Sequence, residues 1–535
     1  MGCDRVSASM QAHQNGADVE DPHLPDNDAN ATGTHAKATK HIRSTFAVLC
    51  ISLVVINTTF SVMGPILPQE AEKRGVGPRA VGMIFSIYAF VNFCVSPYMG
   101  KALQRGLVQR KSLLLAGQVI CAVSAGAFSL VIFLNTPTAF LCVCLALRVV
   151  NGVGSAAVDT ASFAIISSLF ADSDFFGAAM GISESFLSLG WIVGPLVGGY
   201  AADVAGFAAP FILTGGLALL ATPVLYFLMP SMESPERKDS EAPVTILQLV
   251  KVPSVCVLLI ASLLAAASLT FLDPLLGPYL QQEYGFSVSL VGLCFGICAI
   301  LYAVASPLAG WLGDRIGMFR ITVAGLFLMA VGYTLLGPAP PLQALLGPMH
   351  QEWLIWVSLS IVGVGAGMAF VPLLPAMLTS LAAVGIEEEG LTDVMSGLLS
   401  GSFSLGGGAG PILGGLLAAW FGFQWAAAAF GLVQLVMALA VAVVSVRVAG
   451  KARSEQELVR ATAAELAREQ QNGGLEPGMS TARHRSPERQ RRRKEVVTPR
   501  GLSRGRLSGQ WQHSDRSDAL RHPLLAPPTR PQDNA

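Results

Sequence analysis

Long apolar runs separated by short polar stretches dominate the chain between residues 44 and 447. Each run is close to the roughly 20 mostly apolar residues that an α-helix needs to cross the hydrocarbon core of a bilayer. We therefore interpret the runs as membrane-spanning helices. They fall near residues 44–66, 80–100, 111–134, 138–168, 174–202, 208–229, 252–277, 288–311, 320–338, 353–380, 392–418 and 423–447.

The first six runs and the last six carry related sequences. Residues 81–85 (Val-Gly-Met-Ile-Phe) recur about 210 positions later as residues 291–295 (Val-Gly-Leu-Cys-Phe), and the Gly-Pro-x-x-Gly-Gly of 194–199 recurs at 410–415. Such a period is much longer than that of solenoid repeats. We therefore predict two homologous halves, an arrangement common in transporters, whose substrate site lies between the halves near the middle of the bilayer.

The predicted fold is an all-α membrane protein with twelve transmembrane helices in two pseudo-symmetric six-helix bundles. The bundles cover residues 44–229 and 252–447, and a charged cytosolic linker at 230–251 joins them. The polar tails, residues 1–43 and 448–535, are expected to be mostly disordered because they have few apolar residues to bury.

Composition and charge support a membrane protein and give its orientation. Apolar residues make up 52% of the chain and charged residues 13%, whereas a soluble domain carries about 25% charged residues. Lys and Arg accumulate in short cytosolic loops, so the loops after the second and eighth helices should be cytosolic, and with them both termini. The residues that carry this signal are Lys101, Arg105, Arg110, Lys111, Arg315 and Arg320.

Several classes of function find no support in the residues. Eight of the nine cysteines fall in predicted helices, where a thiol behaves as a small apolar group, so we expect no metal and no cofactor. No nucleophile–base set or phosphate-binding loop indicates an enzyme. The basic run at 489–494 lies in a cytosolic tail, where anionic lipid is a better partner than nucleic acid.

Four ionisable residues lie inside predicted helices and are the first candidates for function. They are Arg148 and Asp159 in the fourth helix, Glu184 in the fifth and Asp273 in the seventh. A charge at the middle of the bilayer costs about 3 kcal/mol or more, so such a residue indicates a substrate or proton site. Arg148 and Asp159 share a helix face, but a rise of about 16 Å prevents direct pairing.

The acids break the symmetry of the two halves. By the offsets between the repeats, the positions equivalent to the three acids are Phe370, Ser400 and Phe60. Three carboxylates against one arginine leave a site that can hold cations. A carboxyl group in apolar surroundings has its pKa raised towards neutrality, so it can take a proton from one side and surrender it as an ammonium group binds. The alternative for each acid is an ion pair that only fixes packing.

The segment Gly310-Trp-Leu-Gly-Asp-Arg-Ile-Gly317 resembles the G-x-L-x-D-R-x-G loop signature of the major facilitator superfamily. The resemblance implies that Asp314 and Arg315 latch helix ends on the cytosolic side and tune the opening of the inward gate. In the first half, Gln104 stands where the Asp is expected, which argues against a symmetric latch.

Glycine and proline at equivalent positions of the fifth and eleventh helices are candidates for conformational change. Small residues let helix backbones approach closely, and proline bends a helix by removing one hydrogen bond. We interpret these positions as surfaces that rock against each other. They are Gly194, Pro195, Gly410 and Pro411.

A narrower resemblance is to the vesicular amine transporter family, and most to its vesicular polyamine transporter branch. Residues 64–75, 81–85, 271–274 and 423–428 carry it. That family exchanges lumenal protons for cytosolic organic cations, so the resemblance implies that this chain loads amines into an acidic compartment.

The resemblance also implies roles for individual residues. Asp273 matches an acidic position in helix 7 of the amine transporters, and Glu184 has a counterpart in the polyamine branch. Arg148 belongs to a helix-4 signature linked to proton coupling. Asn57 stands near the position where monoamine transporters carry an Asp, which argues against classical monoamines and for another cation.

We therefore predict a proton-coupled antiporter of a polyamine or related amine, working by alternating access in an intracellular vesicle membrane. The expected partners are the cation, protons and the bilayer, with sorting machinery at a dileucine pair, Leu524 and Leu525. Two alternatives stay open. One is a drug or multidrug cation exporter at the plasma membrane, and the other is a ligand sensor that signals through the tail without transport.

Overall fold

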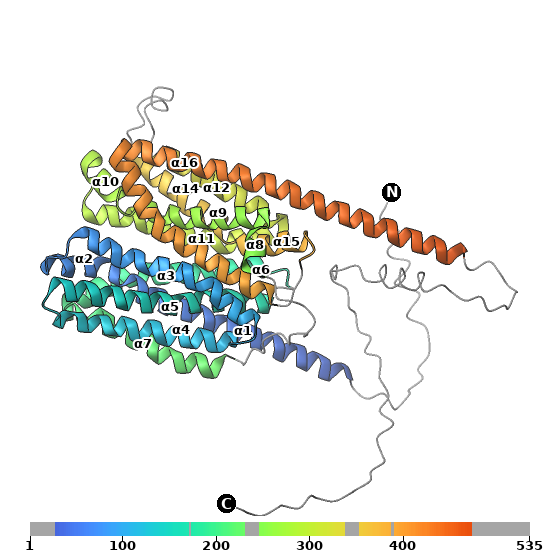
Figure 1. Ribbon diagram of the computed structural model, residues 1–535, viewed down its shortest axis with the longest axis horizontal. Helices are drawn as coiled ribbons and strands as arrows, with labels where there is room; N and C mark the ends of the chain where they lie inside the picture. Colours follow the sequence, from blue (N-terminus) through green and yellow to red (C-terminus); the bar gives the residue numbers. More distant parts are fainter. Residues whose placement is uncertain (1–26, 171–172, 230–244, 337–351, 387–389, 473–535) are drawn as a thin grey trace, which may run out of the picture. The chain divides into compact units, whose positions relative to one another are not determined.

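The structure of the 535-residue chain is a computed structural model that describes residues 27–170, 173–229, 245–336, 352–386 and 390–472. Regular secondary structure in these residues is entirely helical (Figure 1). The first half contains α1 (Asn27–Ser61), α2 (Met63–Lys73), α3 (Pro78–Gln104), α4 (Arg110–Phe128), the 3₁₀ helix η1 (Ser129–Phe133), α5 (Pro137–Phe170), α6 (Phe176–Ala205) and α7 (Ala208–Leu228). The second half contains α8 (Ile246–Val250), α9 (Pro253–Phe271), α10 (Leu276–Tyr284), α11 (Val288–Ile316), α12 (Met318–Leu336), α14 (Glu352–Phe370), α15 (Leu373–Ala382) and α16 (Leu391–Asn472).

The predicted number of membrane crossings is confirmed. Eleven helical stretches of the described residues are long and apolar enough to span a bilayer. The last stretch, Leu391–Lys451, contains a kink at Gly422, whose φ of 78° is a left-handed value that glycine adopts readily. The kink divides α16 into two crossings and brings the total to twelve.

Helix extends further into both tails than the sequence indicated. α1 begins at Asn27, well before the expected start at residue 44, and α16 continues to Asn472. Extending a helix that is already nucleated adds one hydrogen bond per residue without a new nucleation cost. The Ala-, Glu- and Arg-rich sequence of 451–472 also consists of strong helix formers. Helix therefore occupies residues 27–43 and 448–472 of the tails that were expected to be mostly disordered.

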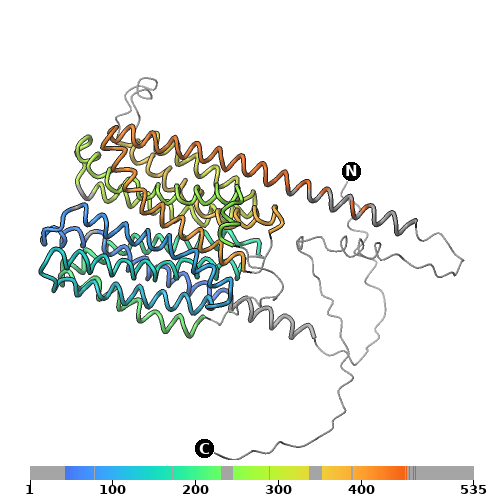
Figure 2. Tube along the Cα trace, viewed as in Figure 1, coloured from blue at the N-terminus to red at the C-terminus, as the bar shows by residue number. Residues whose placement is uncertain are grey.

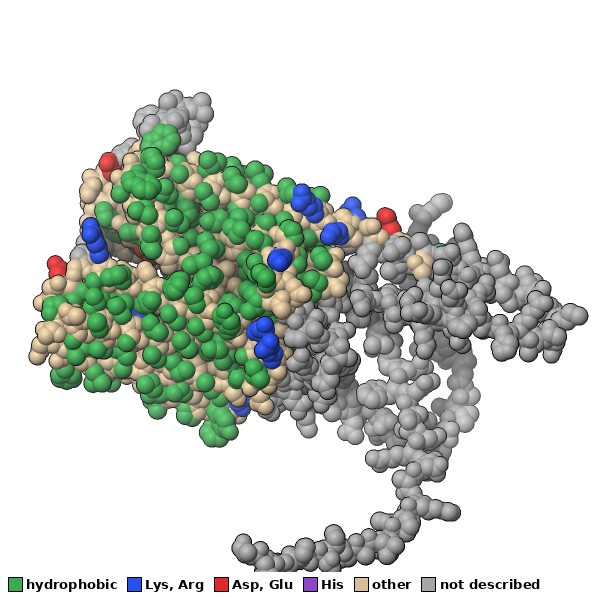
Figure 3. Space-filling model, in the orientation of Figure 1, with side chains coloured by type: hydrophobic (Ala, Val, Ile, Leu, Met, Phe, Trp, Pro, Cys, Tyr) green, Lys and Arg blue, Asp and Glu red, His purple; other side chains and the backbone are tan. Residues whose placement is uncertain are grey.

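The two halves form separate groups of nearly parallel helices, which differ in colour in Figure 2. α1 enters the bundle at the same end at which α16 leaves it (Figure 1). We call this end, which also carries the loop 105–109 and Gly317, the terminal end. The opposite end carries α2 and α10 (Figure 1). Hydrophobic side chains cover the flank of the bundle, and Lys and Arg lie towards its ends (Figure 3), as expected for a surface in contact with lipid.

The most extensive contacts between the halves are those of α3 with α16 and of α6 with α11; we call them the α3–α16 seam and the α6–α11 seam. Both are packed closely through glycine at the terminal end. A Cβ atom added at Gly397 would collide with the backbone oxygen of Ser96, and one added at Gly181 would collide with that of Ser306. These glycines allow the backbones of opposite halves to touch.

At the opposite end of the bundle, glycines of both seams lack such close contacts. A Cβ atom added at Gly82 or Gly292, or at Gly199 or Gly415, would meet no atom of the described residues within 4 Å. The structure therefore holds the two halves together at the terminal end while the equivalent helix ends beyond the middle of the bundle lack such contacts.

Candidate functional site

Arg148 lies on α5 with 1% of its surface exposed. Its guanidinium stands 5.1, 5.2 and 4.8 Å from the ring centroids of Phe60, Phe85 and Tyr88, which provide cation–π contacts. Its Nε donates to the backbone oxygen of Ile84 over 3.3 Å. In the described part of the chain no carboxylate pairs with it, and its Nη2 has no hydrogen-bond partner.

Asp159 lies three turns further along α5 and is surrounded by neutral donors. Its Oδ2 accepts hydrogen bonds from Asn92 Nδ2 at 3.1 Å and from Ser155 Oγ at 3.0 Å. Tyr88 OH in turn donates to Ser155 Oγ at 2.6 Å. Asp159 therefore has polar partners but no positive one among the described residues, as the separation from Arg148 predicts.

Glu184 lies on α6 with 1% of its surface exposed and bonds across the α6–α11 seam. Its Oε2 accepts a hydrogen bond of 2.9 Å from Tyr302 OH on α11. Asp159 is close enough for its charge to interact with that of Glu184. The charges of two of the three candidate acids thus interact, and both acids lack a cationic partner among the described residues.

Asp273 occupies a different place from this pair. It lies in the turn between the end of α9 at Phe271 and the start of α10 at Leu276, beyond the apolar span Pro253–Phe271 and not inside the seventh helix as expected. Its side chain is exposed, and the described residues give it no hydrogen bond or ion pair. Its charge interacts with the neighbouring Tyr333 and Cys298. Asp273 is therefore free to bind a ligand, but outside the hydrogen-bond network of the other acids.

Asn57 is engaged within the first half. Its Oδ1 accepts a hydrogen bond of 2.8 Å from Trp191 Nε1, and its Nδ2 donates to the backbone oxygen of Leu53 over 2.9 Å. Both ends of the amide are used, and the sequence could not indicate this because Trp191 lies far along the chain on α6. The structure assigns Asn57 a role in packing α1 against α6.

The candidate latch residues divide between two roles. Asp314, near the end of α11, accepts hydrogen bonds from the backbone N–H groups of Gly177 at 2.9 Å and Ala178 at 3.0 Å, in the first turn of α6. It therefore caps a helix of the opposite half. Arg315 does not take part, because its guanidinium lies 4.0 Å from the ring centroid of Trp311 on its own helix.

A second link at the terminal end was not predicted. Arg110, at the start of α4, donates from Nε and Nη2 to the two carboxylate oxygens of Asp393 on α16, at 2.8 and 3.0 Å. Asp393 is 1% exposed. The sequence offered Arg110 only as a cytosolic loop charge, and no spacing indicated its partner. The ion pair stands on the side where Gln104 replaces the expected Asp.

The Gly-Pro positions pack helices within each half. A Cβ atom added at Gly194 would collide with Ser61 of α1, and one added at Gly410 with Thr270 of α9. Pro195 and Pro411 lie inside α6 and α16 beside these crossings. The glycines that bring opposite halves together are instead those of the two seams, and a role of the Gly-Pro positions in conformational change stays a prediction.

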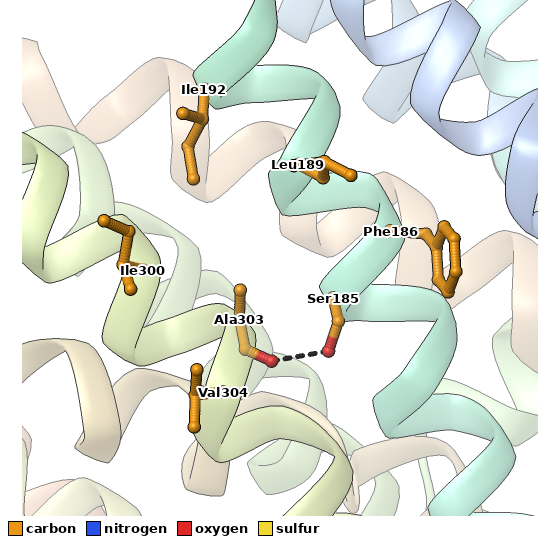
Figure 4. A pocket seen from close by; sticks show the side chains of 7 residues that line it. All are labelled: Ser185, Phe186, Leu189, Ile192, Ile300, Ala303 and Val304. Atoms are coloured by element: carbon orange, nitrogen blue, oxygen red, sulfur yellow. Dashed lines mark hydrogen bonds between the residues drawn. The ribbon is translucent and has the colours of Figure 1, made fainter.

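An apolar groove lies between α6 and α11 on the α6–α11 seam (Figure 4). It has a volume of about 280 Å³ and is bridged by a hydrogen bond of 2.5 Å from Ser185 Oγ to the backbone oxygen of Ala303. Its lining residues are Ser185, Phe186, Leu189, Ile192, Ile300, Ala303 and Val304.

The candidate sorting residues Leu524 and Leu525 lie outside the described residues.

Comparison with known proteins agrees with this geometry. Residues 49–388 match the model of the Major Facilitator Superfamily. The chain is 35% identical over 387 residues to the MFS-type transporter SLC18B1 of Rattus norvegicus. The aligned residues cover 72% of this chain and 82% of that protein. It is 25% identical over 393 residues to the Synaptic vesicular amine transporter of Mus musculus, covering 72% of this chain and 69% of that protein.

A solved structure shows the same fold. The human organic anion transporter MFSD10 (TETRAN) matches with a TM-score of 0.60 and 17% identity, covering 75% of this chain and 99% of that one. At this identity the likeness concerns the fold alone. All of these relatives are transporters rather than enzymes. The chain belongs to the major facilitator superfamily, and within it is similar to the MFS-type transporter SLC18B1 and, more weakly, to vesicular amine transporters.

Proposed function

We propose that this chain is a proton-coupled antiporter that carries a polyamine or a related organic amine across an intracellular vesicle membrane. The observation that carries the proposal is the pair Asp159 and Glu184, two carboxylates inside the protein with only neutral hydrogen-bond donors. Arg148 supplies neither of them with an ion pair in the described part of the chain.

The chemistry of such a pair favours exchange of cations. An uncompensated carboxylate at membrane depth is costly, so it is stabilised either by a proton or by a cationic ligand. A proton and an ammonium group therefore compete for the same oxygens. Asp159 and Glu184 are neighbours, which suits a ligand with more than one ammonium group. Asp273 offers a further free carboxylate on the route to the opposite end.

Alternating access requires that the two ends of the path open in turn. We assign the terminal end to the cytosol because its loops carry Lys101, Arg105 and Arg110. Both seams, the Asp314 cap and the Arg110–Asp393 pair are closed at this end. With this assignment, the acids are closed to the cytosol, and protons and substrate reach them from the lumenal side.

The names of the relatives support the substrate class and the compartment. One relative is named the Synaptic vesicular amine transporter, and this name states both a compartment and a substrate class. This chain has Asn57 near the position where monoamine transporters carry an Asp in helix 1, and Trp191 already occupies the amide oxygen of Asn57. An amine other than the classical monoamines fits better.

Transport by the purified, full-length protein in proteoliposomes tests the proposal. Labelled spermidine and a small panel of amines are supplied outside, with the interior either acid or at the outer pH. Gradient-dependent uptake that is lost in Asp273→Asn or Glu184→Gln supports exchange at these acids, and Glu283→Gln, an exposed acid on α10, is the control. No gradient-dependent uptake of any amine overturns the assignment.

A further inference from the structure

A continuous row of hydrogen bonds leads from Asp159 into the α3–α16 seam. Asn92 Nδ2 donates to Asp159 Oδ2 at 3.1 Å, and Asn92 Oδ1 accepts from Ser96 Oγ at 2.7 Å. Ser96 Oγ lies 3.3 Å from Ser400 Oγ on α16. Asn92 and Ser96 are fully buried and Ser400 is 2% exposed. The row therefore joins the acid to the opposite half through one turn of α3.

The direction of the row follows from the number of hydrogens. Ser96 has one hydroxyl hydrogen, and Asn92 Oδ1 takes it. Ser400 must therefore be the donor to Ser96 Oγ. Every donor in the row then points towards Asp159, from Ser400 through Ser96 and Asn92. A negative charge on Asp159 strengthens each bond of such an aligned row, because hydrogen bonds polarise their neighbours.

The repeat gives an independent reason to regard Asn92 as special. By the offset that relates residues 81–85 to 291–295, Asn92 is equivalent to Tyr302. By the offset that relates the two Gly-Pro motifs, Ser400 is equivalent to Glu184. In the α6–α11 seam these positions form the Glu184–Tyr302 bond. In the α3–α16 seam the acid stands one helix back, on α5, and Asn92 connects it to the seam.

We propose that Asn92 is a positioning residue that transmits the charge of Asp159 to the α3–α16 seam and so couples proton binding to cytosolic opening. The inference rests on the proposed function. With Asp159 ionised, the aligned row holds α3 to α16 and keeps the cytosolic end closed. With Asp159 protonated, the bond to Asn92 loses its charge assistance, which roughly halves the strength of such a bond, and the seam loosens.

This direction is the one that an antiporter needs. A carrier that holds neither proton nor amine has Asp159 ionised and stays closed to the cytosol. It opens to the cytosol only after it has bound a proton, so the empty carrier does not change sides uncoupled from proton movement.

Other ionisable groups face Asp159: Tyr88 on α3, Cys121 on α4 and Glu184 on α6, with Arg148 further along its own helix. α16 contributes none, because it has no charged residue or histidine between Val394 and Phe421.

The test measures cytosolic opening directly and needs no substrate. Two labels are introduced as unnatural amino acids at Leu107 and Val384, which are 71% and 44% exposed on opposite halves at the terminal end. Their distance distribution is recorded in nanodiscs across a pH series. In the unmodified protein we expect the long distance to gain population as the pH falls, and Asp159→Asn should abolish this dependence.

Asn92→Leu keeps the branched shape of the side chain and removes its hydrogen bonds with Asp159, Ser155 and Ser96. We expect the ratio of open to closed forms at high pH to rise about fivefold or more, the equivalent of one lost hydrogen bond, and most of the pH response to disappear. Ser96→Ala and Ser400→Ala should shift the ratio in the same direction by less, and they serve if Asn92→Leu does not fold. Ser396→Ala is the matched control, because Ser396 bonds only to the backbone oxygen of Thr392 on its own helix.

The outcomes separate this inference from the proposed function. A pH response that is unchanged in Asn92→Leu, Ser96→Ala and Ser400→Ala but lost in Asp159→Asn would overturn the relay and leave the acid in place. An equal effect of Ser396→Ala would also overturn it, since any seam serine would then suffice. A relay that behaves as expected in a protein that transports no amine would stand, while the amine assignment would fail.

Discussion

Glu184 and Tyr302 lie 118 positions apart in the chain and face each other across the two halves, with the tyrosine hydroxyl 2.9 Å from the carboxylate. Both side chains are buried, with 1% and 4% of their surfaces exposed. A carboxylate in this position is held by a neutral partner that a cationic ligand can displace. The contact therefore links the charge of the site to the closeness of the halves.

Replacing Glu184 by Gln keeps an acceptor for Tyr302 but removes the charge. Because a hydrogen bond to a charged group contributes about 1.5–3 kcal/mol, we expect gradient-driven amine uptake to fall on the order of tenfold or more. Initial rates in proteoliposomes measure this. Glu283→Gln should behave as the unmodified protein, and an equal loss in both variants would show that the effect is not specific to the buried acid.

The ion pair between Arg110 and Asp393 should stabilise the state that is closed to the cytosol. Removing one partner of a buried pair typically costs about 3–5 kcal/mol because the other charge is left unpaired, so Asp393→Ala should open the terminal end. Reactivity of a thiol probe placed at Val384 reports the change. The exposed Arg105→Gln is the control. The double exchange of Arg110→Asp with Asp393→Arg should restore closure, and failure to do so while both single variants open would argue against a direct pair.

Glycine at position 181 is required for closure at the α6–α11 seam. A Cβ atom there collides with the backbone of Ser306 and Pro307, whereas one at Gly199 meets nothing within 4 Å of the described residues. Gly181→Ala should therefore reduce transport several-fold at normal expression, and Gly199→Ala should not. Uptake normalised to protein in the membrane decides the matter, and equal rates for the two variants would contradict the close packing.

The hydrogen bond between Trp191 and Asn57 should act on stability more than on substrate choice. Trp191→Phe leaves Asn57 Oδ1 without its donor, which typically costs about 1–3 kcal/mol for a buried group. We expect a lower melting temperature in detergent and an unchanged order of preference within a panel of amines. A changed order of preference among the amines at unchanged stability would indicate that Asn57 belongs to the substrate site.

The fold could be predicted almost completely from the sequence, because each crossing is a mostly apolar run whose length is fixed by the bilayer. The repeat of residues 81–85 at 291–295 divided the chain in two without any structural knowledge. The apolar pattern did not give the ends of α1 and α16, which continue as helix beyond their apolar parts. Hydrophobicity identifies the membrane-spanning segments of the chain, but it does not indicate where a helix ends outside them.

The candidate acids could be named from the sequence, but their partners could not. Glu184, Asp159 and Asp273 stand out because a charge in an apolar run is costly. The contacts of Glu184 with Tyr302 and of Arg110 with Asp393 depend on how the halves meet, and no local pattern encodes that. Asn92 carried a weak signal, as an amide within the apolar run of α3 at the position equivalent to Tyr302.

The most direct test of proton-coupled exchange records both ions in the same vesicles. Proteoliposomes with an acid interior and an internal pH-sensitive dye receive labelled spermidine outside, and amine uptake and interior alkalinisation are followed together. The account predicts that the two rise in a fixed proportion, and that Glu184→Gln abolishes both. Amine uptake without proton release, or proton release that does not depend on the amine, would contradict it.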